Sequence, residues 1–349
     1  MGELPHTRRS FLGLAGGSAL LCTIGGETVN VDSPRALARA DALAAAVPRP
    51  AAARARAAAF PEIPPAPGGQ RREFWIQAEA HRWNVIPTGK DDWEGMRVPR
   101  PHRFPAMVYR EMTPGFAAHV RPITIPGPTL YAQEGDVIAV HFRNALSKQA
   151  VTMHPHGVRY NTEYDGAYMG RYTHTGGYIG PGEEFTYQWE CVPGSVGAWP
   201  YHDHGPNHVI NAMRGLFGTV VVRPRGARWP DHTFNLFLHS FAPNITGLDA
   251  NFQCINGRSF AGNTPTLTAK VGEDVEFNVF GMDNFFHTFH IHGHRWRDGA
   301  GTPVDNPTVG PNETVTARFT EDNPGRWLYH CHVFSHMMAG MAGWYVVTE

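Results

Sequence analysis

The chain has 349 residues, a length that corresponds to about two domains of ordinary size, and its composition excludes several classes of protein. Its formal net charge of -1 lacks the basic excess that a phosphate-binding surface needs, so we expect no nucleic-acid partner. Charged residues make up only 17% of the chain, whereas glycine (38 residues) and proline (29 residues) are abundant. This mixture favours strands and loops over long charged helices.

The N-terminal segment has the pattern of an export signal followed by a linker. Arg8 and Arg9 precede an apolar run over residues 11–24, which resembles a twin-arginine signal. The run is shorter than the roughly 20 residues of a transmembrane helix, so we expect no membrane association. We therefore predict a signal peptide over residues 1–45, an Ala/Pro-rich linker over residues 46–71 and a secreted, extracellular protein. Several stretches fit the cleavage site equally well.

An internal repeat follows, in which four short motifs occur twice in the same order. Each copy opens with Pro-Thr-Leu, continues with His-x-His-Gly and Gly-x-Trp-x-Tyr-His-x-His, and ends with Met-x-Gly-x-x-Gly. The motifs lie at residues 128–130, 154–157, 197–204 and 213–218 in the first copy, and at residues 265–267, 290–293, 325–332 and 338–343 in the second. Four matches in the same order indicate two copies of one domain.

Short apolar stretches within both copies, such as residues 137–142 and 275–280, are typical of β-strands. Turns separate them, and no long amphipathic helix intervenes, which indicates β-sandwiches. We therefore predict an all-β chain with a first domain over residues 72–225 and a second over residues 226–349.

The strongest chemical signal is a blue-copper loop, in which His336 lies five residues after Cys331 and Met341 five residues further on. Two imidazoles and a thiolate with a weak axial methionine form an electron-transfer copper site. The second imidazole is expected from His287. A structural zinc site is disfavoured, because such sites rarely use methionine.

Eight further histidines form four His-x-His pairs, two in each repeat: His154 and His156, His202 and His204, His290 and His292, and His330 and His332. Histidines clustered at this spacing point to metal binding. Because successive side chains of a strand face opposite ways, His330 and His332 should point away from Cys331 and reach a second metal site. The chain then links the two sites through a few covalent bonds.

The four pairs, the blue-copper loop and the two-domain length resemble the small bacterial two-domain laccases of the multicopper oxidase family, over residues from about 72 to 349. This resemblance implies two cupredoxin-like Greek-key β-sandwiches and about four coppers per chain: one type 1, one type 2 and a type 3 pair. It assigns His154 and His290 to the type 2 copper. It assigns to the type 3 pair His156, His202, His204, His292, His330 and His332.

The first repeat lacks the ligands of a type 1 copper. Asp203 stands at the position of Cys331, Leu216 at that of Met341 and Val151 at that of His287, and only His208 matches His336. We therefore expect one type 1 copper per chain, in the second domain. His208 is expected to be a surface or supporting residue.

The family resemblance also implies the activity, which is the oxidation of phenolic or similar organic donors by one-electron steps and the reduction of O2 to water. The resemblance also makes Tyr160 and Asp165, which lie six and eleven residues after His154, candidate catalytic residues. Asp165 would supply protons, and Tyr160 would be redox-active. The alternative is that Asp165 forms a turn with Gly166 and that Tyr160 only packs. The natural donor cannot be identified from the sequence.

Three other functions use related copper sites. A cuprous or manganous oxidase would share all the ligands, whereas a copper nitrite reductase or an electron carrier would leave histidines unexplained. Each repeat contributes four of the eight histidines, so a head-to-tail contact between chains would complete the cluster. The resemblance implies a homotrimer with the trinuclear cluster between chains. Cys191 and Cys254 either form a disulfide or are separate buried thiols.

Overall fold

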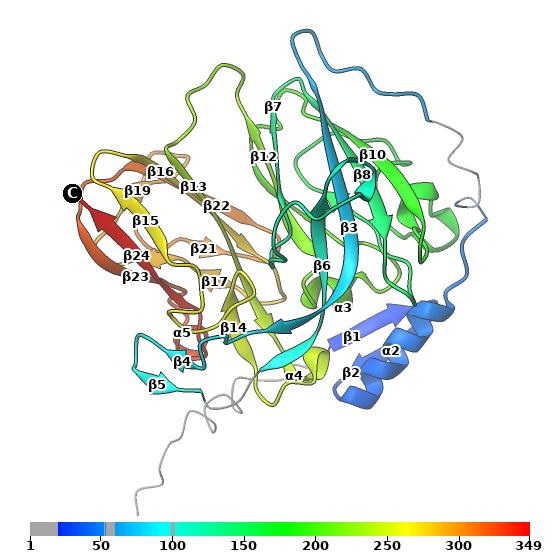
Figure 1. Cartoon of the computed structure of the whole chain (residues 1–349), viewed down its shortest axis with the longest axis horizontal. Coiled ribbons are helices and arrows are strands. Elements are labelled where there is room, and N and C mark those ends of the chain that lie inside the picture. The colour runs from blue at the N-terminus through cyan, green and yellow to red at the C-terminus, as the bar shows by residue number, and fades with distance from the viewer. Residues whose placement is uncertain (1–19, 52, 54–59, 99–101) are drawn as a thin grey trace, which may run out of the picture. The chain divides into compact units, whose positions relative to one another are not determined.

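The computed structural model describes residues 20–51, 53, 60–98 and 102–349, which form two compact units (Figure 1). The N-terminal unit comprises Ala19–His81 and Pro105–Trp229, and the C-terminal unit includes Arg82–Phe104 and Pro230–Glu349. Arg8 and Arg9 of the predicted export signal lie outside the described residues.

The N-terminal unit contains two four-stranded sheets. The strands of the first sheet are, in order, β10 (Glu184–Glu190), β8 (Val137–Asn144), β3 (Arg71–Asn84) and β6 (Arg103–Met112). Those of the second sheet are β7 (Thr129–Gln133), β12 (Phe217–Arg223), β11 (Gly197–His202) and β9 (His154–Pro155). Strands β7 and β12 run parallel, whereas β11 is antiparallel to both of its neighbours.

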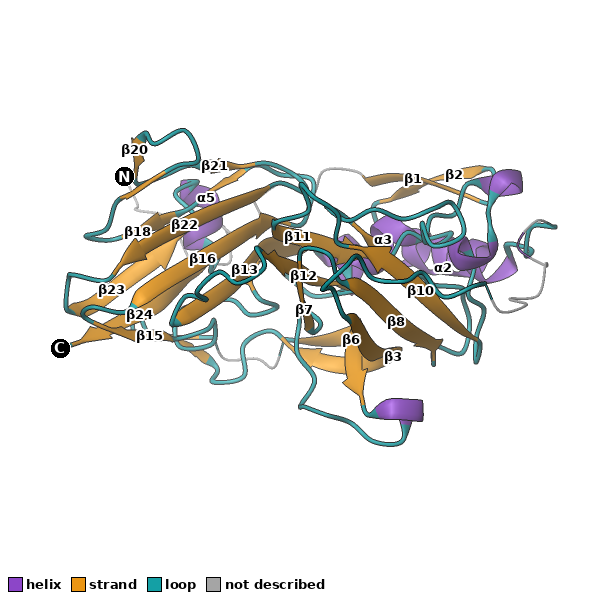
Figure 2. Cartoon of the chain, turned by 90° about the horizontal axis from the view of Figure 1, so that it is seen from above, coloured by secondary structure: helices purple, strands orange, loops and turns teal. Residues whose placement is uncertain are grey.

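The C-terminal unit repeats this plan. Its first sheet contains, in order, β14 (Phe252–Ile255), β13 (His232–Phe241), β16 (Asp274–Gly281) and β22 (Thr314–Thr320). Its second sheet contains β15 (Leu267–Lys270), β24 (Ala342–Thr348), β23 (Gly325–His330) and β18 (His290–Ile291). In Figure 2 the strands β13, β16 and β22 run side by side. The second sheets of the two units have matching orders, with a parallel outer pair in each. The structure thus confirms the all-β prediction of two sandwiches.

The remaining elements are short. The small strand pairs are β1 (Leu20–Ile24) with β2 (Glu27–Val31), β4 (Lys90–Asp91) with β5 (Met96–Arg97), β17 (His287–Thr288) with β21 (Thr308–Val309), and β19 (Trp296–Arg297) with β20 (Pro303–Val304). The helices are α2 (Pro34–Ala46), α3 (His208–Met213), α4 (Pro243–Thr246) and α5 (Phe334–Met338). Among the described residues, no helix combines the length and the apolar character needed to cross a membrane.

The division between the units differs from the predicted boundaries. It falls at residues 229 and 230, and the C-terminal unit also takes in Arg82–Phe104, which the repeat assigns to the first domain. The Trp83 indole donates a hydrogen bond to the Gly257 carbonyl oxygen (2.6 Å), and the Arg258 guanidinium lies over the Trp83 ring (3.7 Å to its centroid). Such long-range contacts leave no trace in the spacing of repeated motifs.

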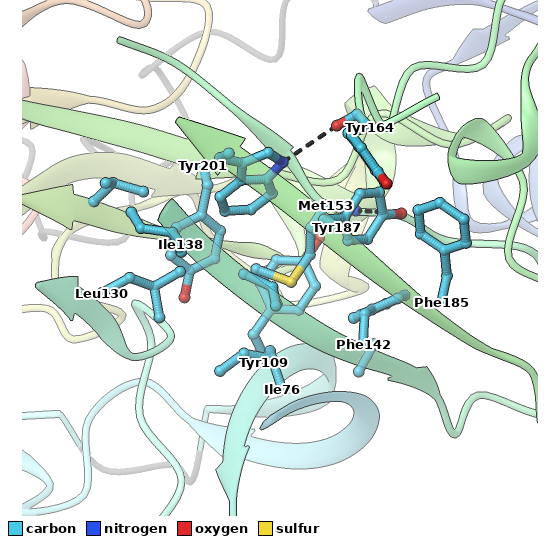
Figure 3. Packing of buried hydrophobic residues seen from close by; sticks show 14 of the residues in the cluster. Ile76, Tyr109, Leu130, Ile138, Phe142, Met153, Tyr164, Phe185, Tyr187 and Tyr201 are labelled. Atoms are coloured by element: carbon cyan, nitrogen blue, oxygen red, sulfur yellow. Dashed lines mark hydrogen bonds between the residues drawn. The ribbon is translucent and has the colours of Figure 1, made fainter. Parts of the chain in front are cut away.

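The core of the N-terminal unit supports the first of the predicted metal ligands. Aromatic side chains of β8 and β10, among them Phe142, Phe185 and Tyr187, fill the space between its sheets (Figure 3). Burial of each such side chain stabilises the fold by roughly 1.5–3 kcal/mol. The hydroxyl of Tyr187 lies 3.3 Å from the backbone N–H of Met153, which donates to it, and it donates to the Gly176 carbonyl. The core therefore fixes the backbone directly before His154.

A helix and a hairpin form within the stretch for which the sequence predicts an export signal. Ser33 caps the N-terminus of α2 by accepting a hydrogen bond from Ala36 N–H. Asp41 of this helix makes two hydrogen bonds of 2.9 Å with the guanidinium of Arg214, whose side chain is only 8% exposed. Tyr178 donates a hydrogen bond to the Val47 carbonyl. Residues 33–47 thus pack as part of the N-terminal unit.

All four cysteines are free and buried, so Cys191 and Cys254 do not form a disulfide. The two thiols belong to different units, and each is enclosed by its own core. The fold therefore depends on the packing of its two sandwiches and not on a covalent cross-link.

Replacement of Asp41 by Ala should destabilise the metal-free protein by about 1–2 kcal/mol, because it removes both Asp41 hydrogen bonds from the buried, charged Arg214 guanidinium. Urea denaturation measures this loss. The matched control is Glu27→Ala, which removes the exposed ion pair between Glu27 and Arg39 and should cost much less. Equal effects of the two changes would show that the Asp41–Arg214 contact stabilises the N-terminal unit no more than an exposed ion pair does.

Candidate metal centres

Three ligands of the predicted blue-copper site meet inside the C-terminal unit. Cys331 Sγ lies 3.9 Å from His287 Nδ1 and 3.8 Å from His336 Nδ1, and the two nitrogens are 3.2 Å apart. All three residues are buried, as is Met341. The Cys331 N–H donates to the Met341 carbonyl, and the Met341 N–H donates to the His336 carbonyl. One loop therefore holds Cys331, His336 and Met341, whereas His287 comes from another part of the unit. The atoms surround a single point, as three ligands of one metal ion must.

Two short elements bring these ligands together. The cysteine directly follows β23, which is paired with β24, and His287 begins β17, which is paired with β21. Thr288 connects the two, because its N–H donates to Cys331 Sγ (3.4 Å) and its hydroxyl accepts from the His332 N–H (2.9 Å). The hydroxyl thereby ties the buried site to the next histidine along the chain.

Electrostatics prepare Cys331 to bind a metal as the thiolate. Burial opposes ionisation, but hydrogen bonds with His287 and His336 lower the pKa of Cys331 to about 6. Burial likewise opposes the charge on His287, but hydrogen bonds with Asp283 and Cys331 raise the pKa of His287 to about 9. A metal cation would replace the proton at His287 Nδ1, because a ligating imidazole must be deprotonated there.

A second group of ligands lies at the end of the N-terminal unit's second sheet. In β9 and β11 His154 pairs with His202, and His156 Nε2 lies 3.1 Å from His202 Nε2. The rings of His154 and His204 are 5.1 Å apart. Backbone carbonyls orient two of these rings: His154 Nδ1 lies 2.6 Å from the Asp165 oxygen and His202 Nδ1 lies 2.8 Å from the Asp203 oxygen.

The C-terminal unit repeats this arrangement. His290 pairs with His330 in β18 and β23, and His292 Nε2 lies 3.1 Å from His330 Nε2. Backbone carbonyls of Asp305 and Cys331 again accept from the Nδ1 atoms of His290 and His330, at 2.8 and 2.9 Å. An imidazole whose Nδ1–H donates a hydrogen bond to a carbonyl oxygen has its Nε2 lone pair free to bind a metal ion. The structure thus brings three of the four predicted ligands of each unit within reach of one metal ion, and the fourth lies beside them: the His204 ring is 5.1 Å from that of His154, and the His332 ring is 5.7 Å from that of His290.

The histidine sets have the chemistry that copper requires. Burial lowers the pKa of His202 to about 3, and burial lowers the pKa values of His156, His204 and His330 to about 4. These imidazoles are therefore neutral near pH 7, as metal ligands must be. The Nδ1 atom of His204 is buried and has no hydrogen-bond partner among the described residues. Together with a thiolate site nearby in the sequence, these neutral imidazoles fit copper.

Asp165 and Tyr160 both lie against His154. An Asp165 carboxylate oxygen is 3.1 Å from His154 Nδ1, and the Tyr160 ring packs edge-on at 5.8 Å from the His154 ring. Burial and then the Asp165 carboxylate raise the pKa of Tyr160. Both candidates are therefore placed beside the first histidine set, while their chemical roles stay predictions.

The N-terminal unit contains no second blue-copper group: the described residues close enough to share a metal form three groups, and none includes Asp203. His208, the expected surface or supporting residue, stacks on the ring of His204 at 4.3 Å. His208 begins α3. It does not take the position equivalent to that of His336, because the Leu216 N–H donates to the carbonyl of Asn211 and not of His208.

Three supporting residues escaped the sequence analysis. The Asp283 side chain is 1% exposed and its Oδ1 lies 3.1 Å from His287 Nε2. The hydroxyls of Thr152 and Thr288 accept from the N–H groups of His204 and His332, respectively. The two threonines precede the His-x-His motifs by the same two positions, so the repeat itself carried the signal for them. Nothing in the sequence around Asp283 distinguishes it from a loop acid.

Comparison with known proteins agrees with this geometry. Family models described as multicopper oxidase match residues 122–227 and 239–349, which together exceed half of the chain. The first range contains the histidine set of the N-terminal unit, and the second contains the histidine set and the blue-copper loop of the C-terminal unit.

Two curated relatives represent the sequence matches. A probable nitrite reductase-hydroxylamine oxidoreductase fusion protein of Kuenenia stuttgartiensis is 32% identical over 244 residues, which are 65% of this chain and 28% of that protein. The ferroxidase HEPHL1 of Mus musculus is 29% identical over 348 residues, which are 80% of this chain and 29% of that protein. The chain therefore spans less than a third of the length of either relative.

Solved structures share the fold. A multicopper oxidase matches with a TM-score of 0.64 at 24% identity, covering 82% of this chain and 92% of that one. A blue copper oxidase of Nitrosomonas europaea matches with a TM-score of 0.62 at 23% identity, covering 79% and 86%. A copper nitrite reductase of the same organism matches with a TM-score of 0.60 at 18% identity, covering 80% and 94%. The sandwiches are thus cupredoxin-like, as the sequence predicts.

Replacement of Cys331 by Ser should abolish the blue colour of the copper-loaded protein and lower its copper content by about one ion per chain, because a hydroxyl cannot supply the thiolate that gives the site its character. Visible spectroscopy and elemental analysis measure both. Cys254→Ser is the matched control, since Cys254 is an equally buried free thiol of the same unit. A blue Cys331→Ser protein would refute this assignment of the type 1 ligands.

Proposed function

The chain belongs to the multicopper oxidase family, and we propose that it is a laccase-like member that oxidises phenolic or similar organic donors in one-electron steps and reduces O2 to water. Membership itself makes the protein a copper-dependent oxidoreductase. The laccase-like specificity is supported by the surface beside the blue-copper ligands.

Bound copper ions supply the electron storage and the oxygen chemistry, while the chain supplies placement and tuning. Cys331, His287 and His336 would hold the copper, and the buried Met341 of the same loop as Cys331 and His336 would supply a weak further ligand. Since His330 and His332 flank Cys331 in sequence, a few covalent bonds connect the thiolate to two histidines of the other set. The chain thereby provides a short path between the site of donor oxidation and the cluster.

Exposed aromatic side chains carry the proposal of an organic donor. Phe286, next to His287 in sequence, is 65% exposed, and Phe334, two residues before His336, is 68% exposed. Phe334 packs against the His332 ring at 5.5 Å. Exposed apolar side chains at a functional site mark a binding surface, and aromatic rings favour aromatic ligands through offset or edge contacts. A phenolic ring fits such a surface better than a hydrated metal cation does.

A metal oxidase is the second candidate. Ferroxidases are among the relatives, and the half-buried thioethers of Met337 and Met338 follow His336, where they could receive cuprous ions. The Asp283 carboxylate that touches His287 is buried, so it is not offered to a cation from solvent. A nitrite reductase is less well supported, because it leaves several of the eight histidines of the two sets without a role.

Assembly and export belong to the same proposal. Each unit holds four of the eight cluster histidines. We propose a homotrimer in which sets from neighbouring chains together hold the trinuclear cluster, since heterologous contacts that close form rings. Export through the twin-arginine route, with action outside the cell, fits a protein whose metals are inserted before transport.

Replacement of Phe334 or Phe286 by Ala should raise KM for a simple phenol by about 2- to 10-fold, the loss of one aromatic contact, with little change in kcat. Oxygen uptake by the copper-loaded protein measures this. Tyr172→Ala is the control, because Tyr172 is an equally exposed aromatic residue of the other unit. If the wild type consumes O2 with cuprous, ferrous or manganous ions but not with phenols, the metal-oxidase proposal replaces this one.

Replacement of Asp165 by Asn should lower kcat by about 10- to 100-fold or more at alkaline pH and less at acidic pH, because a positioned proton source matters most where free protons are scarce. The pH profile of O2 uptake under saturating donor gives the result. Glu163→Gln serves as control, since Glu163 pairs with His174 instead of a cluster histidine. An unchanged profile would reduce Asp165 to a turn residue that orients His154.

A further inference from the structure

The N-terminal unit keeps the backbone framework of the blue-copper site. The Asp203 N–H donates to the Leu216 carbonyl (3.0 Å), as the Cys331 N–H donates to the Met341 carbonyl (3.1 Å). The Thr152 N–H donates to Asp203 Oδ1 (2.7 Å), as the Thr288 N–H donates to Cys331 Sγ (3.4 Å). The carboxylate therefore occupies the place of the thiolate.

The same comparison assigns the place of His336 to Asn211. The Leu216 N–H donates to the Asn211 carbonyl (3.2 Å), as the Met341 N–H donates to the His336 carbonyl (3.1 Å). Counting forward from Asp203 points instead to His208, because three extra residues lie between Asp203 and Leu216. The Asn211 amide donates to Asp203 Oδ2 (2.9 Å), so it bridges the two positions at which Cys331 and His336 would hold a metal in the other unit.

This buried pair is fully engaged in hydrogen bonds. Asp203 and Asn211 are both 0% exposed. Asp203 Oδ1 also accepts from the Gly205 N–H (3.1 Å), and Asn211 Oδ1 accepts from Gln149 Nε2 (3.0 Å). A buried carboxylate persists in a fold only when such donors compensate for the water it has lost.

The bonds of this pair lead directly to the first histidine set. Thr152, held by Asp203, accepts from the His204 N–H through its hydroxyl (3.1 Å) and donates to the Gly166 carbonyl (2.6 Å). The Asp203 carbonyl oxygen lies 2.8 Å from His202 Nδ1. The Asp203 carboxylate thus holds the backbone at Gly205 directly and, through Thr152, the backbone at His204 and at Gly166 in the loop of Asp165.

We propose that Asp203 and Asn211 form a metal-free replacement of the blue-copper site that positions His202 and His204 for the copper cluster. In the C-terminal unit the ligand bonds of a copper ion would hold Cys331 and its flanking histidines, and in the N-terminal unit a carboxylate–amide hydrogen bond holds the equivalent backbone. The pair consists of positioning residues. The proposal rests on the copper role of the histidines and is independent of which donor is oxidised.

The donor–acceptor pattern of the pair provides a sharp test. Asp203→Asn places an amide against the Asn211 amide, two donors facing each other, and Asn211→Asp places two carboxylates together. The double variant Asp203→Asn with Asn211→Asp restores one donor and one acceptor with the same atoms and volume. Asp136→Asn is the control, because Asp136 is also a buried carboxylate of this unit that accepts from backbone N–H groups, but it pairs with Arg72 and Arg225.

The measurement is copper retention against a graded chelator, with the type 2 paramagnetic signal and the near-ultraviolet absorption of the type 3 pair as readouts. The blue colour of the C-terminal unit serves as the internal reference. We expect each single variant to hold the cluster coppers about 10- to 100-fold more weakly at unchanged blue colour, and the double variant to recover. Urea denaturation of the metal-free proteins separates this effect from general loss of stability.

The proposal is overturned if both single variants retain cluster copper as the wild type does, or if the double variant recovers stability but not copper. It is overturned also if Asp136→Asn loses cluster copper to the same extent, since any buried charge would then suffice. A wild type that binds only the blue copper would instead refute the proposed function, and this outcome is read from the wild type alone.

Discussion

The alternation of side chains at the end of one strand is the constraint on which both copper-binding regions depend. Where β23 ends, Cys331 turns into the core of its unit and meets His287 and His336, while its two neighbours are released to the other face. The pairing of β23 with β24 fixes this register, because a slip of one residue would exchange the two faces.

The same framework appears twice with different contents. Both units orient their histidines through backbone carbonyls and threonine hydroxyls, and both close the loop with the same backbone bonds. One unit fills the enclosed space with sulfur and imidazole ligands and the other with Asp203 and Asn211. The sandwich fold thus sets the geometry of the histidine sets in both units. The capacity for a blue-copper site depends instead on which side chains fill the enclosed space, and only the C-terminal unit has the sulfur and imidazole ligands there.

Family membership and donor choice are separable for a physical reason. The copper ligands are buried or lie at strand ends, where the fold tolerates few alternatives, and they fall within the two ranges that the family models match. Under the proposed function the donor would meet exposed side chains such as Phe286 and Phe334, which can change without cost to the core. Relatives named as ferroxidase and as nitrite reductase fusion therefore share the framework without indicating the donor.

The sequence by itself determined the ligand types, their spacing and the all-β repeat, because metal chemistry restricts residue types and strand period restricts spacing. It also located Tyr160 and Asp165 beside His154. Only the tertiary structure decided that Arg82–Phe104 joins the C-terminal unit, that Asp283 bonds to His287, and that Asn211 instead of His208 takes the place of His336. Those facts depend on contacts between segments that are distant in the sequence and on a three-residue difference in loop length. Residue spacing alone does not reveal such contacts, and it does not show where in the loop the extra residues are accommodated.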